Sequence, residues 1–271
     1  MNTKTQVRIG IAGLGAIGKA IAIKLDRGIP GCRLTAVAGR DPGRTAEFVA
    51  QLAKPVASVK LADLAEHADI VIECAPAALL MDIIRPVLGA GKKVIVLSAG
   101  ALLEHWGELE ALYGGGGQIM VPSGALIGLD AVTAAAEGNI HSVRMISRKP
   151  PRGLMGAPLL AEQNIDISDL REPLKLYDGT ARAAAKGFPA NLNVAVALSL
   201  AGVGPDKTFL EVWADPGIER NTHRIEVESD SASFSMTIEN IPSENPKTGL
   251  ITAHSVIAML RKLNAPLRVG T

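Results

Sequence analysis

The sequence predicts an α/β protein, with a doubly wound parallel sheet followed by a second α+β domain whose sheet is mainly antiparallel. Three observations predict it. Apolar strands alternate with helical segments through the first half, a glycine-rich turn follows the first strand, and the strands after residue 122 alternate polar with apolar residues. We expect a first domain over 1–122 and a second over 123–246, while a helix within 247–271 packs back on the first.

The first strand leads into a glycine-rich turn. The segment VRIGIAGLGAIGKAIAIKL (7–25) begins as an apolar strand and ends with a helical period, and G-L-G-A-I-G lies between them. Glycines at this spacing allow a tight turn, approach of the backbone to a pyrophosphate, and close packing of helix on strand. The positive end of the helix dipole favours phosphate. We therefore expect a dinucleotide to bind at the turn, through Gly13, Gly15, Ala16, Ile17 and Gly18.

Strands and helices continue to alternate up to residue 121. The expected strands are RLTAVAGR, DIVIECA, KKVIVLSAG and QIMV, and the expected helices include LLMDIIRPVLGAG and LLEHWGELEALY. These strands are apolar throughout, as in a parallel sheet that is covered on both faces, and right-handed crossovers predict a Rossmann sheet. Ligands bind beyond the carboxyl ends of such strands. Ala75, Pro76, Ser98 and Ala99 are therefore predicted to lie on the nicotinamide side.

The end of the second strand bears on the choice between NAD and NADP. An acidic side chain there usually binds the ribose hydroxyls of NAD. This sequence has Gly39-Arg40-Asp41 instead, in which a small residue and an arginine leave space and positive charge for a 2′-phosphate. Asp41 keeps NAD open, and Arg40 can also be read as a solvent-facing turn residue. The pattern allows both cofactors and slightly favours NADP.

The second half has the two-residue period of antiparallel strands. Five segments show it: SVRMISRKP, LREPLKLYDG, KTFLEVWADP, THRIEVESD and SFSMTIENI, with a hairpin at ESDSAS. The apolar segment FPANLNVAVALSLAG (188–202) reads as a helix on one face of this sheet. In THRIEVESD, the residues Arg224, Glu226 and Glu228 belong in water, so His223 points inward with Ile225 and Val227. This pattern alone does not decide whether His223 is packed in the core or faces a functional site.

The bulk composition excludes several classes of function. A net charge of +1 and 3% aromatic residues disfavour nucleic-acid binding, and RKPPR (148–152) favours a solvated turn over a binding stripe. Cys32 and Cys74 read as small core residues of a reducing compartment, with no metal site. No apolar run reaches the roughly 20 residues that span a bilayer, and the polar start gives no signal peptide. We expect a cytoplasmic protein that does not contact membranes.

The chain resembles the L-aspartate dehydrogenase family nearly end to end. The resemblance rests on G-L-G-A-I-G, PSGALIGLDA, KGFPANLNVAVALSLAG, DPGIERNTHRIEVES and NPKTGLITAHSVIAML. It implies that His223 is catalytic and that the cofactor is contacted by backbone at Ala125 and by an asparagine, Asn193 or Asn191. Two residues apart on a helix, those asparagines point about 200° apart, so one faces a ligand and the other caps the helix. Gly39-Arg40 departs from the family's usual pattern.

The implied activity is NAD(P)-dependent oxidative deamination of L-aspartate to iminosuccinate, and then to oxaloacetate and ammonia, together with the reverse reductive amination. Imidazole suits the acid and base steps because its pKa lies near working pH. Four residues could supply donors for the two substrate carboxylates: Ser123, Lys186, Lys247 and Thr248. The family is dimeric, so we expect a homodimer. Two alternatives remain open: a dehydrogenase or reductase of another small amino, imino or oxo acid, and a dinucleotide-sensing protein without turnover.

Overall fold

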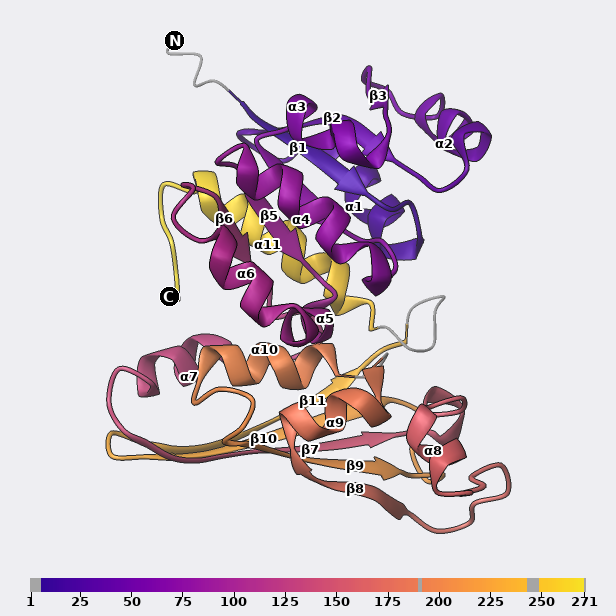
Figure 1. The fold of residues 1–271 in the computed structure, drawn as a ribbon, viewed down its shortest axis with the longest axis vertical. Helices are drawn as coiled ribbons and strands as arrows, with labels where there is room; N and C mark the ends of the chain where they lie inside the picture. Colours follow the sequence, from indigo (N-terminus) through magenta and orange to yellow (C-terminus); the bar gives the residue numbers. More distant parts are fainter. Residues whose placement is uncertain (1–5, 190–191, 243–248, 271) are drawn as a thin grey trace. The chain divides into compact units, whose positions relative to one another are not determined.

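The computed structural model describes residues 6–189, 192–242 and 249–270. The chain forms two compact units (Figure 1). The first unit contains Met1–Gly124 and Thr252–Arg268, and the second contains Ala125–Ile251 and Val269–Thr271. The second unit is therefore inserted between the body of the first unit and its last helix.

The sheet of the first unit is parallel, in the order β3-β2-β1-β4-β5-β6. Its central strands β1, β2 and β4 are largely buried, as their continuous apolar sequences predict. The doubly wound parallel sheet is confirmed. The strands are β1 (Val7–Ala12), β2 (Cys32–Ala38), β3 (Ala57–Ser58), β4 (Ile70–Glu73), β5 (Lys93–Val96) and β6 (Gln118–Met120).

Helices connect these strands. They are α1 (Ala16–Arg27), α2 (Pro42–Val49), α3 (Leu64–His67), α4 (Leu80–Gly89), α5 (Ala99–Glu104), α6 (Trp106–Leu112) and α11 (Ile251–Asn264), with short 3₁₀ turns at Leu61–Asp63 and Ala77–Leu79. The prediction of one continuous helix over LLEHWGELEALY was wrong. The helix breaks at His105, which leaves helical geometry and lies between α5 and α6.

The last helix, α11, belongs to the core of the first unit. Ala253, Val256 and Leu260 follow the three- to four-residue spacing of one helical face and are buried. They join the cluster that contains Ile9 and Ile72 of the central strands. The carboxyl-terminal segment therefore completes the hydrophobic core of the first unit.

The second unit contains a five-stranded mixed sheet in the order β11-β10-β7-β9-β8. Strands β7 and β9 pair in parallel, whereas β10 with β11, β10 with β7, and β8 with β9 pair antiparallel. The mainly antiparallel sheet is thus confirmed, with one parallel pair. The strands are β7 (Ile140–Lys149), β8 (Leu174–Thr180), β9 (Thr208–Ala214), β10 (Asn221–Ser229) and β11 (Ser233–Asn240).

Helices cover one face of this sheet, which we call the inner face. In Figure 1, α7, α9 and α10 all lie on the same side of the strands. The helices of this unit are α7 (Leu129–Ala135), α8 (Pro158–Glu162), α9 (Ala181–Gly187) and α10 (Asn193–Ala201), with a 3₁₀ turn at Pro151–Gly153. Strand β10 alternates as predicted, with His223, Ile225 and Val227 buried and Arg224 exposed. The inward orientation of His223 is confirmed.

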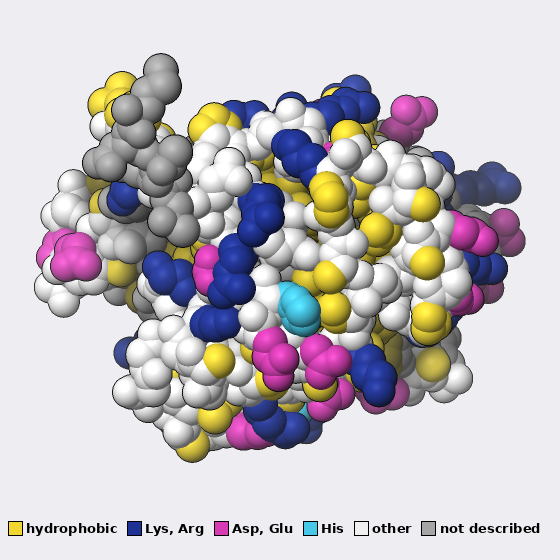
Figure 2. All heavy atoms as spheres, turned by 90° about the horizontal axis from the view of Figure 1, so that it is seen from above, with side chains coloured by type: hydrophobic (Ala, Val, Ile, Leu, Met, Phe, Trp, Pro, Cys, Tyr) yellow, Lys and Arg dark blue, Asp and Glu magenta, His cyan; other side chains and the backbone are white. Residues whose placement is uncertain are grey.

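Charge is distributed on the surface without one dominant sign. Figure 2 shows Lys and Arg side chains interspersed with Asp and Glu over the face it presents. This distribution agrees with the formal net charge of +1. Among the described helices, none is both long enough and apolar enough to cross a lipid bilayer.

Candidate active site

The glycine turn of the first unit lies between β1 and α1. Gly13 has φ +97°, and an added Cβ would lie 2.5 Å from the carbonyl oxygen of Cys74, while a Cβ at Gly18 would overlap the carbonyl oxygen of Gly13. These two glycines are required by the fold itself. At Gly15, by contrast, a Cβ would meet no protein atom within 4 Å. No contact within the protein requires glycine at position 15. Glycine there is consistent with a position where a ligand approaches the backbone.

The other predicted cofactor residues follow the same edge of the sheet. Arg40 and Asp41 follow β2, Ala75 and Pro76 follow β4, and Ser98 with Ala99 follows β5. Because parallel strands end at a common edge, the fold brings these residues together with the glycine turn. Backbone hydrogen bonds join the loops, from Gly13 N–H to the Ala38 carbonyl at 2.8 Å and from Cys74 N–H to the Ala12 carbonyl at 2.7 Å.

Asp41 has a structural role at the end of β2. It is the N-cap of α2, and its carboxylate accepts a hydrogen bond from Arg44 N–H at 3.1 Å. A side chain at Gly39 would overlap the hydroxyl of Thr45, so an acidic residue does not fit there. Arg40 is exposed beside these two residues. The end of β2 therefore presents a cation, and its acidic side chain is engaged in helix capping.

Glu73 is a buried carboxyl group that the sequence analysis missed. It ends β4, and its Oε2 accepts hydrogen bonds from Leu97 N–H at 3.0 Å and Ser98 N–H at 2.8 Å, while Oε1 accepts one from Ser98 Oγ at 3.0 Å. Burial raises the pKa of Glu73, and the hydrogen bonds from Ser98 and Leu97 oppose that rise. Glu73 thus holds the loop after β5 against the end of β4. A charged residue in an otherwise apolar strand was the available signal.

His223 lies on the inner face of the second sheet and is 2% exposed. All five histidines lie in the described residues, and His223 is the one that is buried. Its partner across the strands is Ser147 of β7, whose Oγ lies 3.1 Å from the Nδ1 atom of the ring. Burial, together with the positive charge of Lys149, lowers the pKa of His223 from 6.5 to about 3. The imidazole is therefore neutral near pH 7 and oriented through one nitrogen.

Polar side chains surround His223 on an otherwise apolar face. In the strand register, Asn221 faces Asn240 of β11 and His223 faces Ser147, and Lys149 is two residues beyond Ser147. Asn240 donates from Nδ2 to the carbonyl of Ala125 at 3.0 Å. Ala125, which was predicted to contact the cofactor, is therefore hydrogen-bonded to one of these polar residues. We call these five buried residues, which lie at one end of three adjacent strands, the polar row: Ser147, Lys149, Asn221, His223 and Asn240.

The polar row also contains an unsatisfied acceptor. Among the described side chains, Asn240 Oδ1 is the buried polar atom that lacks a hydrogen-bond partner. A buried acceptor without a partner costs about 1–3 kcal/mol. A ligand with a hydrogen-bond donor, such as the amino group of an amino acid, would satisfy it.

The position of Lys149 differs from the one predicted from the sequence. RKPPR was predicted to form a solvated turn, but Lys149 is the last residue of β7 and is only 4% exposed. Arg148, its neighbour, is on the other face, where it pairs with Asp215 at 3.0 Å and stacks on Trp213. The turn begins only at Pro150. The spacing Met145, Ser147, Lys149 was the signal that could have placed the lysine inside.

The remaining predicted residues lie in both units. Asn193 is the first residue of α10 and half-buried, while Leu192 is the N-cap, so Asn193 does not cap the helix. Lys186 is exposed on α9, and Ser123 lies half-buried in the first unit. Asn191, Lys247 and Thr248 lie outside the described residues. The role of Ser123 and Lys186 as donors for the substrate carboxylates stays a prediction.

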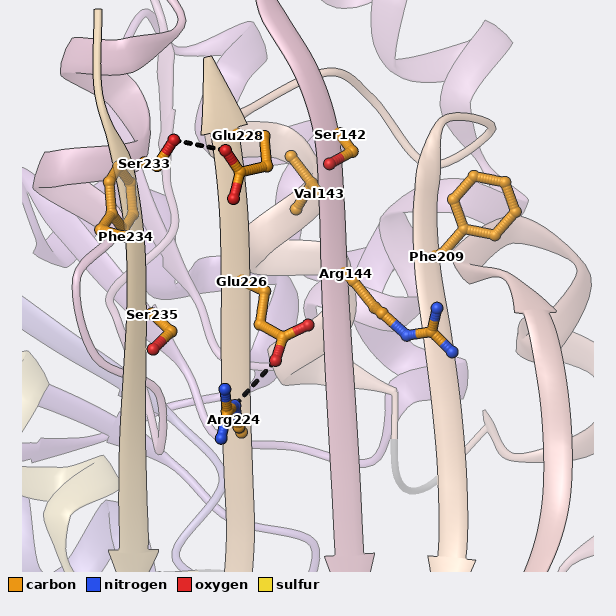
Figure 3. A pocket seen from close by; sticks show the side chains of 10 residues that line it. All are labelled: Ser142, Val143, Arg144, Phe209, Arg224, Glu226, Glu228, Ser233, Phe234 and Ser235. Atoms are coloured by element: carbon orange, nitrogen blue, oxygen red, sulfur yellow. Dashed lines mark hydrogen bonds and ion pairs between the residues drawn. The ribbon is translucent and has the colours of Figure 1, made fainter.

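The outer face of the second sheet carries a separate pocket (Figure 3). Arg224 and Glu226 form an ion pair there at 2.8 Å, and Ser233 bonds to Glu228. Arg144 and Phe209 line the other side. These side chains alternate with the inward residues of the same strands, so the pocket is on the opposite face from His223. It is not part of the polar row.

Comparisons with known proteins agree with both units. Residues 13–122 match the family "Homoserine dehydrogenase, NAD binding domain", and residues 130–263 match "Aspartate dehydrogenase, C-terminal". The first unit is thus an NAD-binding domain of the dehydrogenase type, which supports a nicotinamide dinucleotide as cofactor. Its glycine turn fits such a group, because Gly15 leaves the backbone accessible.

Relatives of full length give the same family. The chain is 67% identical to L-aspartate dehydrogenase 3 of Bordetella bronchiseptica over 100% of both chains. It is 60% identical to L-aspartate dehydrogenase of Bradyrhizobium diazoefficiens over 98% of this chain and 95% of the relative. The crystal structure of aspartate dehydrogenase from Thermotoga maritima shares the fold, with a TM-score of 0.74 at 24% identity, covering 98% of this chain and 100% of that one. The chain belongs to the aspartate dehydrogenase family, which confirms the resemblance.

The glycine turn gives a first prediction. Gly15→Val should fold normally, since no protein atom is close, but should weaken dinucleotide binding by about 100-fold or more, because the side chain occupies the place of the pyrophosphate. Fluorescence titration with the reduced cofactor and the melting temperature measure the two effects. Gly18→Ala is the matched control, and it should lose stability through overlap with Gly13. Unchanged affinity in the Gly15→Val variant would show that the turn does not bind the cofactor.

The low pKa of His223 gives a second prediction. Between about pH 6.5 and 3 the unfolded chain takes up a proton at His223 that the folded chain does not, so the folded state loses stability as the pH falls. This site should remove about 2 kcal/mol of the free energy of unfolding between pH 7 and 5. Urea denaturation at both pH values measures it, and the His223→Gln variant should show a correspondingly smaller loss. An equal loss in both proteins would mean that His223 is not held neutral.

Proposed function

We propose that this protein is an NAD(P)-dependent L-aspartate dehydrogenase, with His223 as its general acid and base. The observation that carries the proposal is the buried, neutral imidazole of His223 among the polar row, in a chain whose other unit is an NAD-binding domain. The family and the 67% identity to a full-length relative support aspartate as the substrate. The reaction converts L-aspartate to iminosuccinate, which water hydrolyses to oxaloacetate and ammonia.

Different residues of this chain bind the cofactor, position the loops and transfer protons. A dinucleotide held at the glycine turn would supply the nicotinamide ring as acceptor for the hydride of the aspartate α-carbon. The glycine turn holds the dinucleotide phosphates, and Glu73 fixes the loop containing Ser98. If Nδ1 of His223 donates to Ser147 Oγ, the Nε2 atom is left unprotonated. Nε2 then takes a proton from the water that attacks the imine carbon, and returns one to the nitrogen that leaves as ammonia.

We propose further that NADP is preferred over NAD. Arg40 is exposed at the end of β2, an acidic residue does not fit at Gly39, and the Asp41 carboxylate is engaged as the N-cap of α2. These features support binding of a 2′-phosphate.

A homodimer is the proposed assembly. The outer face of the second sheet is not covered by helices of its own unit, and Phe209 is 50% exposed on it. Sheets with an open face commonly pair with a second copy of the chain. Light scattering measures the mass in solution, and a monomer at micromolar concentration would contradict this assembly.

The activity assay tests the main proposal. Purified protein with L-aspartate and NADP or NAD should increase the absorbance of the reduced cofactor, and His223→Ala should lower turnover by about 10²–10⁴-fold while cofactor binding persists. His141→Ala is the matched control, since His141 is an exposed histidine on β7. A His223→Ala protein that turns over aspartate at the normal rate but melts early would make His223 a structural residue.

The cofactor preference has its own test. Arg40→Ala should weaken NADPH binding by about 1–3 kcal/mol, the size of a charge-assisted contact, and leave NADH binding nearly unchanged. Titration of both reduced cofactors measures this difference, with Arg33→Ala, exposed at the start of the same strand, as control. Equal losses for the two cofactors would remove Arg40 from phosphate recognition.

A further inference from the structure

Glu73 is the charged residue of a strand in the middle of the parallel sheet. β4 lies between β1 and β5, and Glu73 is 0% exposed at its carboxyl end. In the strand register it lies opposite Ala12, the last residue of β1, and opposite Val96, the last residue of β5. The glycine turn follows Ala12, and the loop that contains Ser98 follows Val96. A carboxyl group is thus buried directly behind the edge at which ligands bind in this fold.

The hydrogen bonds of Glu73 fix the orientation of the Ser98 hydroxyl group. Leu97 N–H and Ser98 N–H both donate to Oε2 of Glu73, at 3.0 and 2.8 Å. Because these groups can only donate, they favour the ionised carboxylate. Oε1 accepts a hydrogen bond from Ser98 Oγ at 3.0 Å. The hydroxyl hydrogen is therefore directed at Glu73, and the Ser98 oxygen keeps its lone pairs as acceptors.

The helix that follows does not use these lone pairs. Ser98 is the N-cap residue of α5, a position where a serine oxygen usually accepts a hydrogen bond from a backbone N–H of the first turn. Within the described chain, the Ser98 side chain makes no such capping hydrogen bond. Ser98 is half-buried, so its side chain is partly accessible. It offers a ligand an acceptor and no donor.

We propose that Ser98 accepts a hydrogen bond from the carboxamide of the nicotinamide, and that Glu73 is the positioning residue that keeps Ser98 an acceptor. The loop after β5 is on the side of the sheet edge predicted to receive the nicotinamide, and the NH₂ of a carboxamide can only donate. This inference depends on the dinucleotide alone and is independent of the substrate.

Such a pair would select the amide form of the cofactor. In the deamido form of NAD⁺, a carboxylate replaces the carboxamide, so that the group has no donor and carries a negative charge. At Ser98 it would meet an acceptor oxygen, with the carboxylate of Glu73 3.0 Å behind that oxygen. Both contacts are unfavourable, so the deamido form should bind less tightly than NAD⁺.

Glutamine at position 73 would reverse the hydrogen bond to Ser98. The amide oxygen of Glu73→Gln can take the place of Oε2 and accept from the N–H groups of Leu97 and Ser98, which leaves its NH₂ group beside Ser98 Oγ. That NH₂ group then donates to the Ser98 oxygen, and the hydroxyl hydrogen becomes available to a ligand. The side chain keeps its shape, while Ser98 changes from an acceptor to a donor. A role of Glu73 in folding alone predicts no such reversal.

Calorimetry with NAD⁺, its deamido form and ADP-ribose, which lacks the nicotinamide, tests the inference without turnover. The wild type should bind NAD⁺ about 10–100-fold more tightly than the deamido form. Glu73→Gln should lower this ratio by about 10-fold or more, while its affinity for ADP-ribose stays within about 3-fold of the wild type. Glu104→Gln removes the same charge at an exposed position of α5 and is the matched control, which should keep the wild-type ratio.

Ser98→Ala tests the acceptor itself. This variant should bind NAD⁺ about 3–10-fold less tightly, the effect of one lost hydrogen bond, and should bind ADP-ribose nearly as well as the wild type. Equal losses for all three ligands in either variant would make Glu73 and Ser98 structural residues and overturn the inference. A wild type that binds the deamido form as tightly as NAD⁺, or a Glu73→Gln variant that keeps the wild-type ratio, would overturn it as well. Because no substrate is present, these outcomes do not depend on whether the protein oxidises aspartate.

Discussion

Burial of the His223 imidazole near the charge of Lys149 is the constraint on which the chemistry proposed for the second unit depends. Both effects disfavour a second positive charge, so the ring is neutral near pH 7. A neutral ring oriented by Ser147 can accept a proton. The reaction proposed for the protein needs this property, because it moves protons to and from the substrate.

The register of the strands creates this environment. β10 pairs antiparallel with both β7 and β11, and this pairing places His223 opposite Ser147 and Asn221 opposite Asn240. A slip of one residue would turn His223 to the outer face. In the first unit, the end of β4 is organised in a similar way, because Glu73 receives hydrogen bonds from the loop after β5. In both units, the buried polar groups of the candidate site lie where strands end.

The local sequence pattern predicted much of this arrangement. It could not predict which residues distant in the sequence would become partners. The alternation in THRIEVES was enough to point His223 inward, and the glycine spacing was enough to find the turn between β1 and α1. The partners of these groups come from elsewhere: Ser147 is 76 residues from His223, and Ser98 is 25 residues from Glu73. Lys149 was missed because the following prolines suggested a turn, although the strand continues through it. The break at His105 had no clear local signal.

The protonation state of His223 in the free protein is the most direct test of this account. NMR titration of the imidazole resonances, assigned by their loss in His223→Asn, measures it between pH 4.5 and 8, roughly two pH units either side of the ordinary histidine pKa. The account predicts that His223 remains neutral throughout this range. A His223 ring that titrates near pH 6.5 would contradict it.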